Sequence, residues 1–271
     1  MDNFLEQITS YLNGDVIHVI ISYLEINDLM KLSQDCDFHG VDWNMVCLHR
    51  FGKFHNMGFT QYIGYLRNLD SIVFIEKIKM VSTINDVLNT DILLLNNKSI
   101  VNIPIEIRAL HNIKHLNLMT NNIIKIPGEL GALVNLKELC LSNNQITQVP
   151  PEIGNLTNLI SINLNNNHIT KIPLELSNLK KLEYLYLNNN KLTKIINGTI
   201  GKLIRLEMLD LSNNLIEKLP RDLGNLSRLG ILTLYGNRLK EIPMSLTKLS
   251  NLYSIDLREN LMKINKILVL K

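Results

Sequence analysis

The stretch LNLMTNNIIKIP, from Leu116 to Pro127, recurs along the chain and decides the fold. Related stretches begin at Leu139, Ile162, Leu185, Leu209, Leu232 and Ile255. One asparagine marks the register at positions 121, 144, 167, 190, 214, 237 and 260, and its spacing of 23 residues rises to 24 only between Asn190 and Asn214. Self-similarity at such a fixed period is typical of a solenoid, in which each unit packs only on its neighbours.

Each unit predicts a short strand with alternating side chains. In the unit around Leu139, we expect Leu139 and Leu141 to point inward and Glu138, Cys140 and Ser142 to point outward. One unit cannot bury its leucines alone, so stacked units share a core beneath a parallel sheet with strands ~4.8 Å apart. The recurring asparagine is expected to be buried, with its amide bonded to the backbone of neighbouring turns.

The second half of each unit, as in VPPEIGNLTNL from Val149, is expected to return the chain along the convex side. Its proline fixes φ, and its glycine permits a tight backbone. Ile196 replaces the proline in one unit, and the segment IINGTIG carries the extra residue, so we predict a local bulge there with the strands still in register. Lys98 replaces the asparagine in the first unit, which suits a terminal unit. No separate cap is recognisable before Lys271, so the last residues either fold over the final leucines or leave an end that contacts something else.

The units resemble the leucine-rich repeat family, whose pattern L-x-x-L-x-L-x-x-N-x-L is matched over roughly two-thirds of the chain. This resemblance implies an α/β solenoid, shaped as a horseshoe, with a parallel sheet on its concave face. We assign residues 89–271 to about eight such units of 23–24 residues.

Outward strand positions form the predicted concave face, which is small and polar in the early units and richer in tyrosine and methionine later. Tyrosine and methionine on an open surface are typical anchors of protein interfaces. The alternative is an ordinary solvated face whose tyrosines are merely good strand formers. The predicted target-binding residues are His115, Tyr184, Tyr186, Met208, Asp210, Ile231 and Tyr235.

The segment ahead of the repeats has apolar residues at helical spacing, and Asn27 is a candidate N-cap of a second helix. The sequence LNGDVIHVIISYLEINDLMKLSQDCDF, residues 12–38, followed by Trp43, resembles the F-box family. Asn13 stands where this family usually has proline, and the interval from Cys36 to Trp43 is shorter than usual. The resemblance implies a small all-α unit that binds the adaptor Skp1 through Leu12, Val16, Ile17, Ile20, Leu24 and Leu29.

We therefore predict an F-box-like helical domain over residues 1–55, a helical linker or N-terminal cap over 56–88, and repeats over 89–271. This pairing implies a substrate-recruiting adaptor of a cullin-type (SCF) ubiquitin ligase, which binds Skp1 with its helices and a target protein on the concave face. The chain also resembles F-box and repeat proteins of amoeba-infecting giant viruses, in which case the ligase would be the host's. The alternative is a stand-alone scaffold, similar to intracellular Ras- and phosphatase-associated repeat proteins, whose N-terminal helices only cap the solenoid.

Composition argues against several other classes. A net charge of +3 with 20% charged residues gives no basic footprint for nucleic acid. The longest apolar stretch near the start, VIHVIISYL, is too short to span a membrane, and the first residues do not form a secretory signal. The three cysteines, Cys36, Cys47 and Cys140, show no disulfide framework, so we expect the cytoplasm (of the host, if the protein is viral), with the nucleus as an alternative.

No enzymatic motif is recognisable in the sequence. There is no glycine-rich phosphate loop after a strand and no catalytic serine or cysteine motif. A zinc site would need the spacing of a known finger, which is not matched by Cys36, His39, Cys47, His49 and His55. We therefore expect a binding protein that is not an enzyme and holds no cofactor or metal.

Overall fold

The computed structural model of the chain describes residues 91–262. The predicted helical segments within residues 1–88, with their Skp1-binding residues, lie outside the described residues. The segment after residue 262, for which two arrangements were predicted, lies outside them as well.

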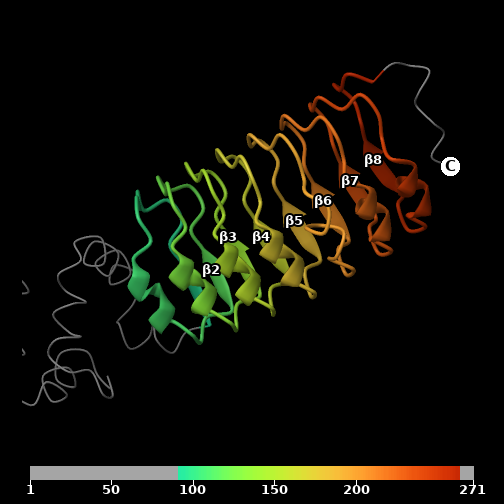
Figure 1. Cartoon of the computed structure of the whole chain (residues 1–271). Coiled ribbons are helices and arrows are strands. Elements are labelled where there is room, and N and C mark those ends of the chain that lie inside the picture. Colours follow the sequence, from blue (N-terminus) through green and yellow to red (C-terminus); the bar gives the residue numbers. More distant parts are fainter. Residues whose placement is uncertain (1–90, 263–271) are drawn as a thin grey trace, which may run out of the picture. The chain divides into compact units, whose positions relative to one another are not determined.

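In the described residues, eight short strands form one parallel sheet whose strand order follows the chain. Equivalent residues are paired throughout, so that Leu116 lies opposite Leu139, and Leu139 lies opposite Ile162. Figure 1 shows the strands following one another along the stack. The predicted parallel solenoid is confirmed here, with strands β1 (Ile92–Leu94), β2 (His115–Asn117), β3 (Glu138–Cys140), β4 (Ser161–Asn163), β5 (Tyr184–Tyr186), β6 (Met208–Asp210), β7 (Ile231–Thr233) and β8 (Ser254–Asp256).

In β1 to β7 the core contains the middle residue of each strand and the next residue but one, whereas the equivalent Ile255 and Leu257 of the last unit are half-buried. Leu139 and Leu141 are at most 1% exposed, as predicted from the alternation. Ser142, predicted to point outward, is instead buried, and so is its equivalent Ser212. Both serines follow the strand where the chain turns, and each hydroxyl contacts the side chain two residues earlier. These contacts join Ser142 Oγ to Cys140 Sγ at 3.4 Å and Ser212 Oγ to Asp210 Oδ1 at 2.7 Å.

The recurring asparagines form a buried ladder, which confirms their predicted role. Asn144 accepts the Ile123 N–H at its Oδ1 (2.9 Å). Its Nδ2 donates to the carbonyls of Leu118 (3.0 Å), Leu141 (3.1 Å) and Ser142 (3.2 Å). One amide thus satisfies backbone groups of its own unit and of the preceding unit, which would otherwise be buried without partners. In the first unit, where Lys98 replaces asparagine, the next asparagine, Asn121, accepts the Lys98 N–H.

The residue before each ladder asparagine has a positive φ, close to +55° in most units. Asparagine tolerates this left-handed conformation better than most residues, because its short side chain bonds locally. This preference explains many of the double asparagines in the sequence. The positive-φ positions are occupied by Thr120, Asn143, Asn166, Asn189, Asn213, Gly236 and Glu259.

The return segments contain short 3-10 helices, each preceded by a proline with φ between −70° and −73°. Neighbouring turns approach one another closely here, since a Cβ added at Gly131 or Gly154 would lie 2.4 Å from the carbonyl oxygen of Glu152 or Glu175. The glycines are therefore required by backbone packing between units. The helices are η1 (Ile105–Ala109), η2 (Gly128–Ala132), η3 (Pro151–Asn155), η4 (Leu174–Asn178), η5 (Arg221–Asn225) and η6 (Met244–Lys248).

The unit with the extra residue has an irregular turn in place of a 3-10 helix between β5 and β6. Gly198 adopts φ +82° there, and its N–H donates to Asp222 Oδ2 of the next unit (2.5 Å). Tyr184 nevertheless pairs with Met208 in the regular register. The predicted bulge with strands in register is confirmed.

None of the described helices is long and apolar enough to cross a membrane. Within residues 91–262, no group of three or more His, Cys, Asp or Glu side chains is placed to hold a metal ion.

Candidate protein-binding face

The outward side chains of the strands form one continuous surface, here called the sheet face, which corresponds to the predicted concave face. It consists of the first and third residues of β1 to β8, with the residue two positions after each strand. The register aligns its residues in rows across the strands. Tyr184, Met208 and Ile231 form one row, and Tyr186, Asp210 and Thr233 form the next.

Six of the seven predicted target-binding residues are brought together on β5, β6 and β7 and immediately after β7. Five of them are half-buried, and Tyr235 is 37% exposed. We call this surface the C-terminal patch; it comprises Tyr184, Tyr186, Met208, Asp210, Ile231 and Tyr235. Large, partly exposed aromatic and sulfur-containing side chains on a rigid sheet supply contact area at low entropic cost, as protein interfaces require.

His115 is not part of this patch. It lies on β2, separated from β5 by β3 and β4, and its Nδ1 is 3.2 Å from Glu138 Oε2 on the neighbouring strand. The structure therefore places this predicted residue on the sheet face between Ile92 of β1 and Glu138 of β3, away from the tyrosines.

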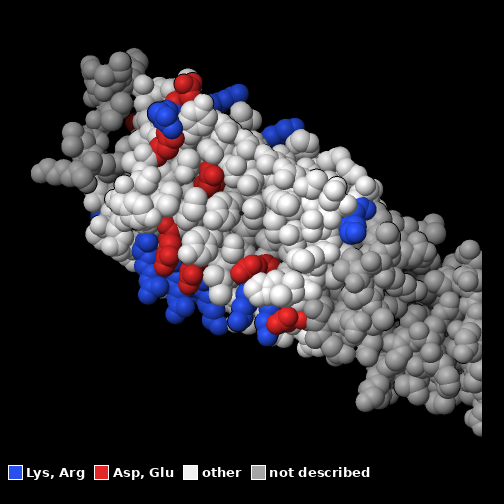
Figure 2. Space-filling view, turned by 180° about the vertical axis from the view of Figure 1, so that it is seen from behind, with Lys and Arg blue, Asp and Glu red and all other residues white. Residues whose placement is uncertain are grey.

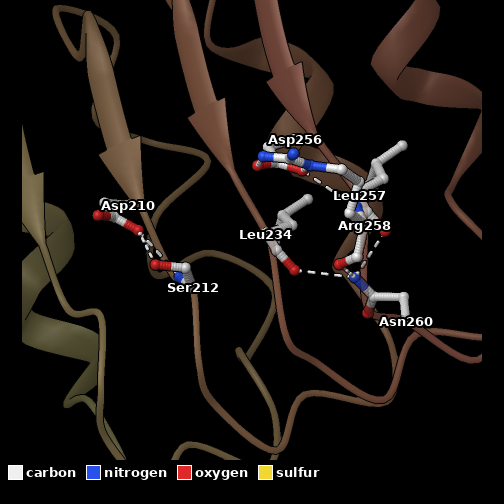
Figure 3. Close-up of polar contacts among 7 residues, drawn as sticks. All are labelled: Asp210, Ser212, Leu234, Asp256, Leu257, Arg258 and Asn260. Atoms are coloured by element: carbon white, nitrogen blue, oxygen red, sulfur yellow. Dashed lines mark hydrogen bonds and ion pairs between the residues drawn. The ribbon is translucent and has the colours of Figure 1, made fainter.

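Asp210 is held in a fixed orientation at the centre of the C-terminal patch. Its Oδ1 accepts hydrogen bonds from the Ser212 N–H (2.9 Å) and the Ser212 hydroxyl (2.7 Å). Figure 3 shows the second carboxylate oxygen directed away from Ser212. One oxygen of Asp210 is thus used by the protein, while the other is left for a ligand.

The same local turn recurs in every second strand of the sheet. The side-chain oxygen of the third strand residue accepts the N–H two residues later at Asn117, Asn163, Asp210 and Asp256. The accepting side chains are amides in the N-terminal half and carboxylates in the C-terminal half. The same turn therefore presents a neutral group in the early units and a negative charge in the later ones.

Asp256 differs from Asp210 because an arginine neutralises it. Arg258 Nε donates to Asp256 Oδ1 (3.0 Å), and Arg258 Nη2 donates to Asp256 Oδ2 (2.7 Å), as drawn in Figure 3. The hydrogen bond from Arg258 lowers the pKa of Asp256. The same guanidinium lies 5.9 Å from the centroid of the Tyr235 ring, a distance at which cation–π attraction holds both groups.

Glu207 borders the patch beside Tyr184. Its negative charge, followed by burial of the phenol, raises the pKa of Tyr184, because both disfavour the phenolate. Glu207 therefore places a negative charge beside one aromatic ring of the patch.

Sequence reasoning missed Tyr253, which is 79% exposed and precedes β8 by one residue. Its ring lies against Gly230 at the equivalent position of the previous unit, where an added Cβ would lie 2.6 Å from Tyr253 Cε1. A glycine followed one repeat later by a tyrosine was the available signal. Tyr253 extends the aromatic surface beyond β7.

A row of basic side chains lies just before the strands, at the start of the sheet face, and we call it the basic edge. Figure 2 shows Lys and Arg gathered along one long edge with Asp and Glu beside them, while the middle of that view is largely uncharged. The basic edge comprises the exposed residues Lys114, Lys137, Lys181, Arg205 and Arg228.

Two family models match the middle of the chain. Residues 127–209 match a family model described as leucine-rich repeat region, and residues 180–239 match one described as leucine rich repeat. A comparison with curated proteins gave no match.

Solved structures of three proteins resemble the chain. A leucine-rich-repeat protein of Leptospira interrogans is 37% identical with a TM-score of 0.62, covering 64% of this chain and 44% of that one. The ectodomain of the receptor kinase GASSHO1/SCHENGEN3 from Arabidopsis thaliana, in complex with CASPARIAN STRIP INTEGRITY FACTOR 2, is 35% identical with a TM-score of 0.55, covering 59% and 20%. A plant peptide hormone receptor in complex with RGF2 is 32% identical with a TM-score of 0.58, covering 63% and 28%. The chain spans less than half the length of each.

Proposed function

We propose that this chain, in which residues 127–239 match leucine-rich-repeat models, binds a protein partner through the C-terminal patch and performs no chemistry itself. The observation that carries the proposal is the patch: the register gathers two tyrosines, a methionine and an isoleucine around Asp210. Two structurally similar proteins are plant receptors solved in complex with a named factor or hormone, which supports a binding role for this type of solenoid.

We further propose that the chain is a substrate-recruiting adaptor of a cullin-type ubiquitin ligase. The support is the F-box resemblance of residues 12–43, of which Ile20 and Leu24 are part. In this role the N-terminal helices bind Skp1, the C-terminal patch holds a target, and the other ligase subunits transfer ubiquitin. The mechanism is proximity, because a held target has a high effective concentration at the ligase. This role requires the cytoplasm or the nucleus.

Binding of purified Skp1 to the full chain tests this adaptor role. We expect the wild-type protein to bind and the double variant Ile20→Asp/Leu24→Asp to lose binding. Circular dichroism must show that both proteins keep the same fold. The variant Tyr184→Ala/Tyr186→Ala is the matched control, since it alters the patch and should leave Skp1 binding unchanged. A folded wild-type chain that does not bind Skp1 would overturn the adaptor role.

A stand-alone scaffold is the second candidate function, because a solenoid requires a cap at its end and helices before the repeats could serve only that purpose. The two functions differ in what the N-terminal substitutions do. In a scaffold, Ile20→Asp/Leu24→Asp lowers the melting temperature of the repeats and leaves the affinity of the folded chain for its patch partner unchanged.

A further inference from the structure

The carboxylates on the C-terminal half of the sheet face differ in whether the protein itself satisfies them. Asp256 is paired with Arg258 through an ion pair of 2.7 Å. Asp210 has no ion-pair partner among the described residues, and the only hydrogen bonds to its carboxylate there come from Ser212, both to Oδ1. Asp210 is thus an un-neutralised carboxylate with one oxygen left for a donor from outside.

The side chains around Asp210 indicate what kind of ligand would carry such a donor. Tyr186 and Thr233 flank Asp210 on the neighbouring strands, and Met208 precedes it on the same face. Adjacent strands are ~4.8 Å apart, and alternate residues along a strand are roughly 6.6 Å apart. When a ligand group binds Asp210, the adjacent parts of the same ligand can therefore contact the aromatic and apolar side chains around it.

We propose that the partner bound at the C-terminal patch is a protein segment with a lysine or arginine between apolar side chains, and that Asp210 binds its cationic group. The inference rests on the proposed protein-binding function. Charge complementarity carries it, because a cation is the group that an unpaired carboxylate in a mostly uncharged surface favours. A polyanion such as nucleic acid would meet a carboxylate at this point instead of a cation.

Geometry also limits how the cation is bound. A bidentate arginine pair needs both carboxylate oxygens, and Ser212 already donates twice to Oδ1. Only Oδ2 is left, so the contact is a single charge-assisted hydrogen bond. Lysine, which acts as a point charge, should then bind as well as arginine.

Selection from a random peptide library on the immobilised full chain tests the proposal. We expect enriched sequences to contain lysine or arginine within two or three residues of aromatic or aliphatic side chains. A synthetic peptide of the enriched sequence should bind Asp210→Asn about tenfold more weakly at low salt, as is typical for a charged hydrogen bond, and the difference should shrink at high salt.

The matched control is Glu138→Gln on β3, which removes an equal charge from the sheet face away from the patch. It should change the peptide's affinity less than twofold, whereas glutamine in place of the peptide's basic residue should reproduce the loss seen with Asp210→Asn. Enriched peptides without a basic residue, or equal binding to wild type and Asp210→Asn, would overturn the inference and leave the protein-binding function standing. Enrichment that is the same on Tyr184→Ala/Tyr186→Ala, or absent from the wild type, would overturn the protein-binding function and this inference together.

Discussion

The interior and the sheet face of the same strands follow opposite rules. Inside, units two to seven repeat the same residue types at the same places, with leucine or isoleucine at the strand centre and the ladder asparagine after it. Outside, the third strand residue changes from asparagine to cysteine, tyrosine, aspartate and threonine. Packing between identical turns requires the same residue types in every unit, whereas side chains on the sheet face do not pack between turns and are free to vary. Its variation is therefore where binding specificity can be encoded.

The ladder asparagines should show the largest effect of any polar substitution. Asn167→Ala removes the acceptor of the Ile146 N–H (2.9 Å) and the donor to the carbonyls of Leu141 (3.0 Å) and Leu164 (3.1 Å). Because these backbone groups are buried, we expect the free energy of unfolding to fall by about 3 kcal/mol. Urea denaturation followed by circular dichroism measures the loss.

Asn163→Ala, on the sheet face of the same unit, is the control. This half-buried amide accepts one hydrogen bond, from the Asn165 N–H (3.1 Å), so its loss should cost about 0.5–1 kcal/mol. Equal losses for the two alanine variants would contradict the distinction between interior and sheet face.

Contacts between return segments should show the next largest effect. In Gly154→Ala the new Cβ would lie 2.4 Å from the Glu175 carbonyl oxygen, which forces two turns apart. We expect a loss of about 2 kcal/mol, a magnitude usual for overpacking, visible as a lower urea midpoint. Ser177→Ala is the control: Ser177 is the equivalent residue of the next unit, and the turn that follows it is the irregular one around Gly198. If Gly154→Ala and Ser177→Ala are equally mild, close packing is not what selects glycine.

Most of the interior could be predicted from sequence because each feature depends on a short pattern repeated many times. Leu139 and Leu141 follow from alternation, the ladder role of Asn144 from its period, and the bulge at Gly198 from one extra residue. The exposure predicted for Ser142 was wrong because its side chain is short and its hydroxyl folds back onto Cys140 Sγ (3.4 Å), whereas the larger Tyr235 at the equivalent position is exposed.

The sequence predicted which residues lie on the sheet face, but it did not predict which of their charges are paired. The register alone placed Tyr184, Met208 and Ile231 in one row. Which carboxylates are neutralised depends on side-chain rotamers, so the pairing of Asp256 with Arg258 had no sequence signal comparable to a repeat. The role of the asparagine before the ladder asparagine, as in Asn143, was hidden by the general abundance of asparagine. A left-handed φ also adds nothing to the pattern of hydrophobic residues.

The positive-φ position offers a small gain in stability. Thr120 adopts φ +55°, which is unfavourable for a β-branched residue, whereas Asn143 fills the same position of the next unit. We expect Thr120→Asn to raise the free energy of unfolding by about 0.5–1 kcal/mol, because the strain is relieved and the backbone bond from the Thr120 N–H to the Ser142 carbonyl (2.9 Å) is kept. Asn143→Thr should shift the urea midpoint in the opposite direction; a shift of the same sign would show that backbone strain is not the cause.

The pair formed by Arg258 and Asp256 should give the smallest effect, because the Arg258 side chain is 81% exposed and solvent screens the attraction. Arg258 holds the pKa of Asp256 below its ordinary value, so the pair adds stability above the pKa of an unfolded aspartate and loses it as the pH falls through the lower folded value. Arg258→Gln should therefore raise the pKa of Asp256, measured by carbon NMR of its carboxyl group. It should also lower the melting temperature slightly at neutral pH and not in acid. A deficit that persists in acid would mean that Arg258 stabilises the chain by packing on Tyr235, 5.9 Å away, and not by charge.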